Sequence, residues 1–237
     1  MVLPLNLAMT AAEMSAADTV PPHCAWMACH FSPCSQGLAN VPETLPKGAM
    51  LILNDRFPCQ GHSPDLVAWQ LAEAVARLEC ESVLLDFQRP EEPESAAMVH
   101  AVMNALSCPV GVSEAYAKKP AWPVFLSPAP LHMELREWLA PWQGRQIWLE
   151  AALCQEFVSV TEKGTIFTPQ FPTDHLDGGF FDKNLCCNYR TEIRAEEIRF
   201  TLYDTPASLE KKLKKAHSLG VTRAVGLYQE LHAFIKV

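Results

Sequence analysis

The sequence lacks the features that mark a membrane or nucleic-acid-binding protein. It has no basic amino-terminal leader, and no apolar run approaches the roughly 18 residues that span a bilayer. The formal net charge is −8, and the only dense basic run, 211–215, is expected to be the solvated face of an amphipathic helix. We therefore expect no nucleic-acid or membrane partner, and a cytoplasmic protein, or a secreted one if a native leader was removed.

The sequence also lacks the cysteine spacing of a common zinc site. Nine cysteines cannot all pair within one chain. Cys24, Cys29 and Cys34 follow a C-x4-C-x4-C spacing near His23 and His30, which is wider than the usual C-x2-C pair. A strand beginning near Cys24 would hold these thiols apart. We expect reduced, mostly buried thiols, no metal and no cofactor.

The pattern of apolar segments predicts a barrel of alternating strands and helices. Eight segments read as strands: 2–8, 25–31, 49–55, 82–88, 109–114, 123–127, 146–152 and 224–230. Eight such units in one domain of this length (1–237) are typical of a (β/α)8 TIM barrel. An open doubly wound sheet is the alternative, but the first βα junction has no Gly-x-Gly-x-x-Gly.

Helix signals separate the later strands. Capping residues and apolar periodicity predict helices over 63–78, 95–106, 131–139 and 205–219. Before the last helix the pattern changes to alternation, with a turn at Lys163-Gly164 that predicts a hairpin. Residues 156–204 are therefore expected to form a small antiparallel β insertion between the seventh strand and the last helix.

The stretch Glu81–Pro90 is the centre of the functional reading. Its apolar residues are typical of a strand buried on both faces, and polar groups follow at its carboxyl end, where ligands bind in α/β sheets. Because side chains alternate along a strand, Asp86 and Gln88 are expected to lie side by side, facing the interior.

At this stretch the chain resembles the family 18 glycoside hydrolases, the chitinase and endo-N-acetylglucosaminidase group. Glu81–Pro90 is similar to the family signature Asp-x-x-Asp-x-Asp-x-Glu on the fourth strand, and Leu202–Lys212 with 216–230 is similar to its carboxyl-terminal segment. The resemblance implies a TIM barrel and an N-acetylated glycan as ligand. It also implies an acid at the last signature position and an Asp two residues earlier that orients the substrate's acetamide.

The signature departs from the family at the position of the acid. Gln88 stands where the catalytic Glu is expected, while Asp86 is retained. Leu84 replaces the middle Asp, Tyr228 replaces the Trp of the last strand, and no clear Met-x-Tyr-Asp follows the sixth strand. These changes favour a carbohydrate-binding pseudoenzyme.

Two alternatives remain open. Other carboxylates are predicted at strand ends, so an active hydrolase would use Glu114, Glu150 or Glu230. Glu114 and Glu230 are candidates for a two-carboxylate pair across the barrel mouth, and Asp55 and Glu150 are further ligand-binding candidates. Alternatively, barrel mouths collect polar residues in any case, and the chain is a scaffold whose partner docks on the insertion.

Aromatic residues near the predicted strand ends are candidates for stacking on sugar rings. Phe57, Tyr116, Trp122 and Tyr228 are in this group, with Tyr116 and Tyr228 as ligand-binding candidates, whereas Trp138, Trp142 and Trp148 are expected to pack a helix onto the barrel.

Overall fold

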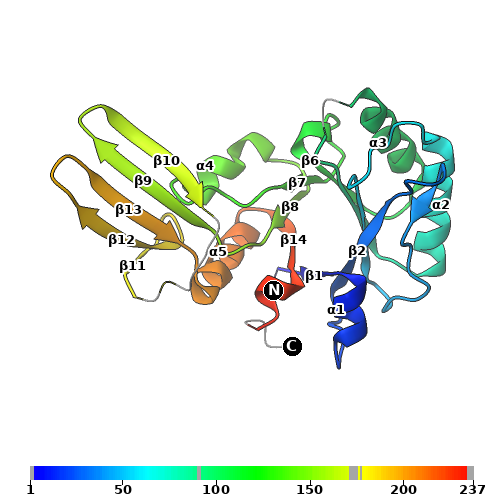
Figure 1. Ribbon diagram of the computed structural model, residues 1–237, viewed down its shortest axis with the longest axis horizontal. Coiled ribbons are helices and arrows are strands. Elements are labelled where there is room, and N and C mark those ends of the chain that lie inside the picture. The colour runs from blue at the N-terminus through cyan, green and yellow to red at the C-terminus, as the bar shows by residue number, and fades with distance from the viewer. Residues whose placement is uncertain (1–2, 90–91, 171–175, 177, 234–237) are drawn as a thin grey trace.

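Eight parallel strands close into a barrel, as predicted (Figure 1). The structure is a computed structural model that describes residues 3–89, 92–170, 176 and 178–233. The barrel strands are β1 (Leu5–Met9), β2 (Cys24–Phe31), β4 (Met50–Asn54), β5 (Ser82–Asp86), β6 (Val110–Ser113), β7 (Val124–Leu126), β8 (Ile147–Glu150) and β14 (Val221–Leu227). They pair in chain order, and parallel pairing of β1 with both β14 and β2 closes the ring. A short antiparallel strand, β3 (Leu38–Ala39), adds to the end of β2.

Two helices begin where the capping residues predict, whereas the helix expected from Ser95 begins earlier, at Pro93. The helices and helical turns are α1 (Ala11–Ala16), α2 (Pro64–Arg77), α3 (Pro93–Ala105), η1 (Glu114–Tyr116), α4 (Leu135–Leu139), η2 (Ala140–Trp142), α5 (Pro206–Ser218) and α6 (Tyr228–Leu231). Ser63 caps α2, and Thr205 forms a capping box at α5. The helix expected over 131–139 begins only at Leu135, because Leu131 packs into the core of the insertion instead.

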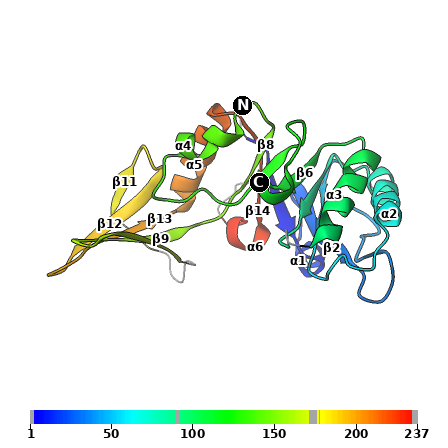
Figure 2. The same cartoon turned by 90° about the horizontal axis from the view of Figure 1, so that it is seen from above.

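The insertion is a five-stranded antiparallel sheet that projects from one side of the barrel (Figure 1; Figure 2, seen from above). Its strands are β9 (Gln155–Thr161), β10 (Gly164–Gln170), β11 (Phe180–Asp182), β12 (Cys187–Ile193) and β13 (Ile198–Tyr203), in the order β10-β9-β13-β12-β11. The β9–β10 hairpin predicted at Lys163-Gly164 is confirmed. In both views α4 and α5 lie near the base of this sheet.

Two separate apolar cores show which side chains face the barrel interior. One core joins strand residues to helix residues and therefore lies between the ring and its helices. The other is built from strand residues alone, including Ile52, Leu84 and Trp148, and therefore fills the ring. Trp138 and Trp142 pack against the outer core as expected. Trp148 does not: it is inside the barrel, where the absence of a side chain at Gly111 makes room for its indole.

The last strand lies earlier in the chain than predicted. It spans Val221–Leu227 instead of 224–230, since pairing with β1 aligns Leu5 with Ala224 and Ala8 with Leu227. Tyr228 and Glu230 consequently belong to the short helix α6 that follows the strand. Likewise β6 ends at Ser113, and Glu114 and Tyr116 lie on the turn η1.

Candidate functional site at the barrel mouth

Polar side chains continue the interior alternation at the carboxyl end of the barrel. Two residues beyond the interior residues Ile52, Leu84 and Trp148 come Asn54, Asp86 and Glu150, respectively. Asn54 is directly opposite Asp86 in the β4–β5 pairing. The expected position of Asp86, on the fourth barrel strand and facing the mouth, agrees with this arrangement.

Asp86 and Gln88 contact each other directly. The strand ends at Asp86, and the exposed Gln88 donates a hydrogen bond from Nε2 to Asp86 Oδ1 at 2.5 Å. Burial raises the pKa of the Asp86 carboxyl, the bond from Gln88 works against this rise, and the nearby Asp55 adds to it. The pair thus holds one carboxyl and one amide at the mouth, and the amide has no acidic proton to give.

The segment after the strand is held by groups that we expected to bind ligand. Asp55 is buried, and its Oδ2 accepts hydrogen bonds from the backbone N–H groups of Gln88 (2.9 Å) and Arg89 (3.0 Å). The Ser113 hydroxyl donates to the Phe87 carbonyl at 3.1 Å, and the Tyr116 hydroxyl donates to the Arg89 carbonyl at 2.6 Å. Asp55 therefore positions Gln88, and the buried ring of Tyr116 offers no open face to a sugar.

Glu150 and Glu230 join Asp86 in one group of carboxyls. Burial raises the pKa of Glu150 most, and the charges of Asp86 and then Glu230 raise it further. Glu230 Oε1 accepts a short hydrogen bond from the Leu153 backbone N–H. Burial raises the pKa of Glu230 despite this bond. Because like charges interact at the mouth, ionising all three carboxyls there is costly.

Glu114 and Tyr228 are placed differently from their predicted strand-end positions. Glu114 is exposed on η1, whereas Glu230 interacts with Leu153 and Glu150, so the structure gives no Glu114–Glu230 pair. Tyr228 is partly buried on α6 and stacks on His232, with ring centroids 4.7 Å apart. Of the other two predicted platforms, Trp122 is buried and only Phe57 remains half-exposed.

His30, which the sequence suggested only as a neighbour of the cysteine series, lies beside Asn54 at the end of β2. His30 is buried, its Nδ1 lies 2.7 Å from the Phe31 carbonyl, and its Nε2 lies 3.0 Å from the Asn40 amide nitrogen. Its ring centroid lies 5.0 Å from that of Phe57. The sequence pattern that points to His30 as a mouth residue is a histidine near the end of an apolar strand.

The amino-terminal end of the barrel is closed by an ionic network. Arg223 Nη1 donates to Glu81 Oε1 at 2.8 Å and to Ser82 Oγ at 2.6 Å, and the guanidinium lies 5.1 Å from the Trp148 ring centroid. Residues at this end of a TIM barrel usually serve stability. The polar groups that remain as candidates for binding a ligand are therefore those at the Asp86 end.

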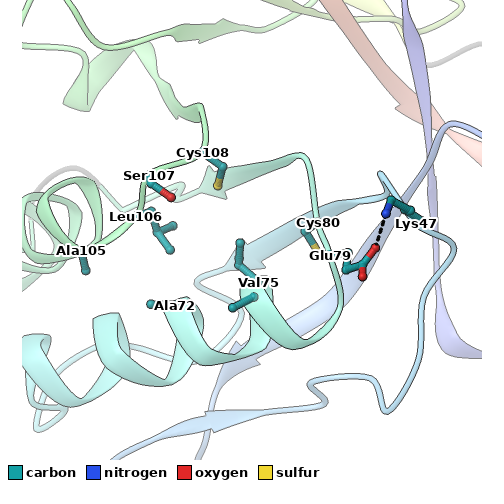
Figure 3. A pocket seen from close by; sticks show the side chains of 10 residues that line it. Lys47, Ala72, Val75, Glu79, Cys80, Ala105, Leu106, Ser107 and Cys108 are labelled. Carbon is teal, nitrogen blue, oxygen red and sulfur yellow. Dashed lines mark ion pairs between the residues drawn. The ribbon is translucent and has the colours of Figure 1, made fainter.

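Two shallow cavities lie away from the mouth. One, of about 380 Å³, lies at the amino-terminal end between α2 and α3, with an ion pair between Lys47 and Glu79 of 2.7 Å at its edge (Figure 3). Burial raises the pKa of its Cys80 thiol to about 11, so the sulfur stays protonated and unreactive at neutral pH. The other, of about 430 Å³, lies between α1 and residues 42–46.

Within the described part of the chain, no group of three or more His, Cys, Asp or Glu side chains is arranged to hold a metal ion. Cys24 and Cys29 are buried in β2, whereas Cys34 is exposed beyond it. None of the helices described is both long and apolar enough to cross a membrane.

The fold and the insertion place the chain in the class of (β/α)8 barrels with an antiparallel sheet between the seventh barrel strand, β8, and helix α5. No family model and no curated protein matches the sequence. Among solved structures, the spore cortex-lytic enzyme SleL of Bacillus cereus is similar, with a TM-score of 0.54, 10% identity, and coverage of 94% of this chain and 70% of that one. SleL of Bacillus megaterium QM B1551 is similar with a TM-score of 0.53, 9% identity and the same coverage. At these identities the likeness is one of fold.

Proposed function

We propose that the mouth of the barrel binds an N-acetylated glycan through Asp86 and Gln88 without hydrolysing it. The observation that carries this proposal is the 2.5 Å hydrogen bond from Gln88 Nε2 to Asp86 Oδ1, at the end of the fourth barrel strand. The resemblance of Glu81–Pro90 to the family 18 signature implies a proton donor at the position of Gln88. The fold likeness to two spore cortex-lytic enzymes supports a carbohydrate as the ligand class.

The chemistry of the pair fits an acetamido group. An ionised Asp86 carboxyl accepts the acetamide N–H, and Gln88 offers an amide carbonyl and a second N–H to neighbouring hydroxyls. Cleavage needs a group that protonates the departing oxygen, and an amide cannot do so. Loss of a general acid typically removes about 100- to 10,000-fold in rate, so we expect binding without turnover.

Calorimetric titration with N-acetylglucosamine oligosaccharides tests this proposal. We expect the wild type to bind and Asp86→Ala not to bind. Gln88→Glu should gain hydrolysis of a chromogenic chitooligosaccharide, because two adjacent carboxyls share a proton and raise one pKa. Gln143→Glu changes an exposed amide elsewhere and serves as the matched control. No heat of binding with wild type and no hydrolysis by Gln88→Glu would remove the proposal.

A second candidate function is hydrolysis with Glu150 as the acid. It is favoured by the raised pKa of Glu150 and by its interaction with Asp86 at the same mouth. A panel of nitrophenyl glycosides between about pH 4 and pH 8 tests it, since a carboxyl acid operates in that range. Activity lost in Glu150→Gln and kept in Glu114→Gln, whose side chain is exposed on η1, would support this function. An inactive wild type would exclude it.

A further inference from the structure

Phe57 lies at the opening of the barrel because of the residue on which it packs. On β2 the side chains of Cys29 and Phe31 belong to the outer core, so His30 between them points into the ring of strands. The Phe57 ring packs against this imidazole, with ring centroids 5.0 Å apart and planes tilted by 55°. Phe57 is therefore placed over the mouth and not among the outer helices.

The turn after β4 holds Phe57 in this place. The Asn54 side chain donates from Nδ2 to the Met27 carbonyl at 2.8 Å, and its Oδ1 accepts from the Arg56 backbone N–H at 3.1 Å. The support beneath the ring is fixed as well, since both ring nitrogens of His30 lie within hydrogen-bond distance of polar groups. The ring of Phe57 thus stands on a side chain that is itself held in place.

Phe57 keeps an accessible surface that the other predicted platforms lack. Its side chain is only partly buried, whereas Tyr116 and Trp122 are buried and Tyr228 is stacked on another ring. The Arg56 guanidinium lies 5.9 Å from the Phe57 ring centroid. This is near the limit of about 6 Å for a cation–π contact, so the guanidinium does not close off the ring.

The register of the strands separates Phe57 from Asp86. Asp86 is paired with Asn54, and Asn54 is paired with His30, so the support of Phe57 is two strands away from Asp86. At about 4.8 Å between neighbouring strands, this separation is about 10 Å. One sugar ring is narrower than this distance, whereas two linked rings reach across it.

We propose that Phe57 is the stacking platform for a second sugar unit, so that the mouth selects oligosaccharides over single sugars. This second subsite rests on the glycan binding proposed above and adds the length of the ligand. One N-acetylated unit lies at Asp86 and Gln88, and the next unit places its C–H groups on the Phe57 ring. The face of an aromatic ring is partially negative, and it attracts the partially positive C–H groups of a sugar.

Calorimetric titrations with N-acetylglucosamine and with its linear trisaccharide test the proposal on the full chain. We expect wild type to bind the trisaccharide at least about tenfold more tightly than the monosaccharide. Phe57→Ala should bring this ratio of affinities down toward unity. Phe57→Leu, which keeps apolar bulk without a flat ring, should lower the ratio as well, and Phe57→Trp should keep it. Phe180→Ala is the matched control: Phe180 is 70% exposed on β11 of the insertion, and its replacement should leave the ratio unchanged.

Failure of the second subsite and failure of the glycan site give different results. A wild type that binds both sugars equally, or a ratio that Phe57→Ala or Phe57→Leu leaves unchanged, would overturn the second subsite alone. Asp86→Ala, which should weaken both sugars, would then still show glycan binding at the mouth. A wild type that binds neither sugar would overturn the proposed function and the second subsite together. Thermal unfolding checks that each variant is folded, and Phe57→Leu carries the comparison where Phe57→Ala does not fold.

Discussion

Replacing Gly111 with Ala tests whether the barrel interior is arranged as described. Trp148 and Glu150 are two residues apart on β8, so they point to the same side of the sheet. If Trp148 fills the interior against Gly111, Glu150 faces the mouth beside Asp86. The φ angle of Gly111 is not in the positive range, so Ala is allowed by the backbone. A Cβ at this position would overlap the Trp148 indole.

Two opposing effects set the change in the free energy of unfolding that Gly111→Ala causes. Overpacking a core usually costs about 1–3 kcal/mol. Gly→Ala also reduces the freedom of the unfolded chain, which stabilises the fold by about 0.4–1 kcal/mol. The free energy of unfolding of Gly111→Ala should therefore fall by about 1–2 kcal/mol, and Tm by about 2–8 °C for a chain of this size.

Urea denaturation followed by circular dichroism measures this change. Trp148→Phe alone and Gly111→Ala/Trp148→Phe complete a double-mutant cycle, in which the smaller ring relieves the overlap. We expect a coupling free energy of about 0.5–3 kcal/mol between the two positions. A Gly111→Ala variant as stable as wild type or more so, with no coupling, would refute the reasoning and leave the direction of Glu150 unsupported.

Three further predictions concern buried polar groups. Lys212→Met leaves Asp204 without the partner that its Oδ2 meets at 2.7 Å, and should lower the free energy of unfolding in urea by about 3–5 kcal/mol. Adding Asp204→Asn should recover part of the loss, and no recovery would contradict the buried-charge explanation. Because the folded pKa of Glu150 is raised, its ionisation disfavours folding as pH rises. Glu150→Gln should thus raise Tm at pH 7, with the gain fading as the pH falls toward the unfolded pKa of about 4.3 and absent below it. An equally large gain in Tm at low pH would show that the gain does not come from the ionisation of Glu150. Asp55→Ala removes the acceptor of two backbone N–H groups, should cost about 1–3 kcal/mol in the same urea assay, and should weaken glycan binding by releasing Gln88. Unchanged binding would show that Asp55 does not position Gln88.

Much of the fold follows from local patterns in the sequence. Short apolar runs locate all eight barrel strands, and the caps Ser63 and Thr205 locate two helices, because these signals depend on neighbouring residues only. Strand alternation predicts Asp86 and Gln88 on one side, and their hydrogen bond agrees with that expectation, although the strand predicted to residue 88 ends at Asp86.

Contacts between segments distant in the chain decided the rest. The pairing of β14 with β1 moved Tyr228 and Glu230 from a strand to α6, and the space over Gly111 placed Trp148 inside the ring. The hydrogen bond by which Asp55 supports residue 88 likewise joins two segments distant in the chain, those that follow β4 and β5.

The amino-acid sequence by itself determined which segments are strands and helices and which residue types stand at the strand ends. Periodicity and capping are local properties, because they depend only on residues close together in the chain. Only the tertiary structure decided which strand-end groups meet at the mouth, and which aromatic ring stays open beside them. Both depend on strand register and packing, which bring residues together across long sequence separations.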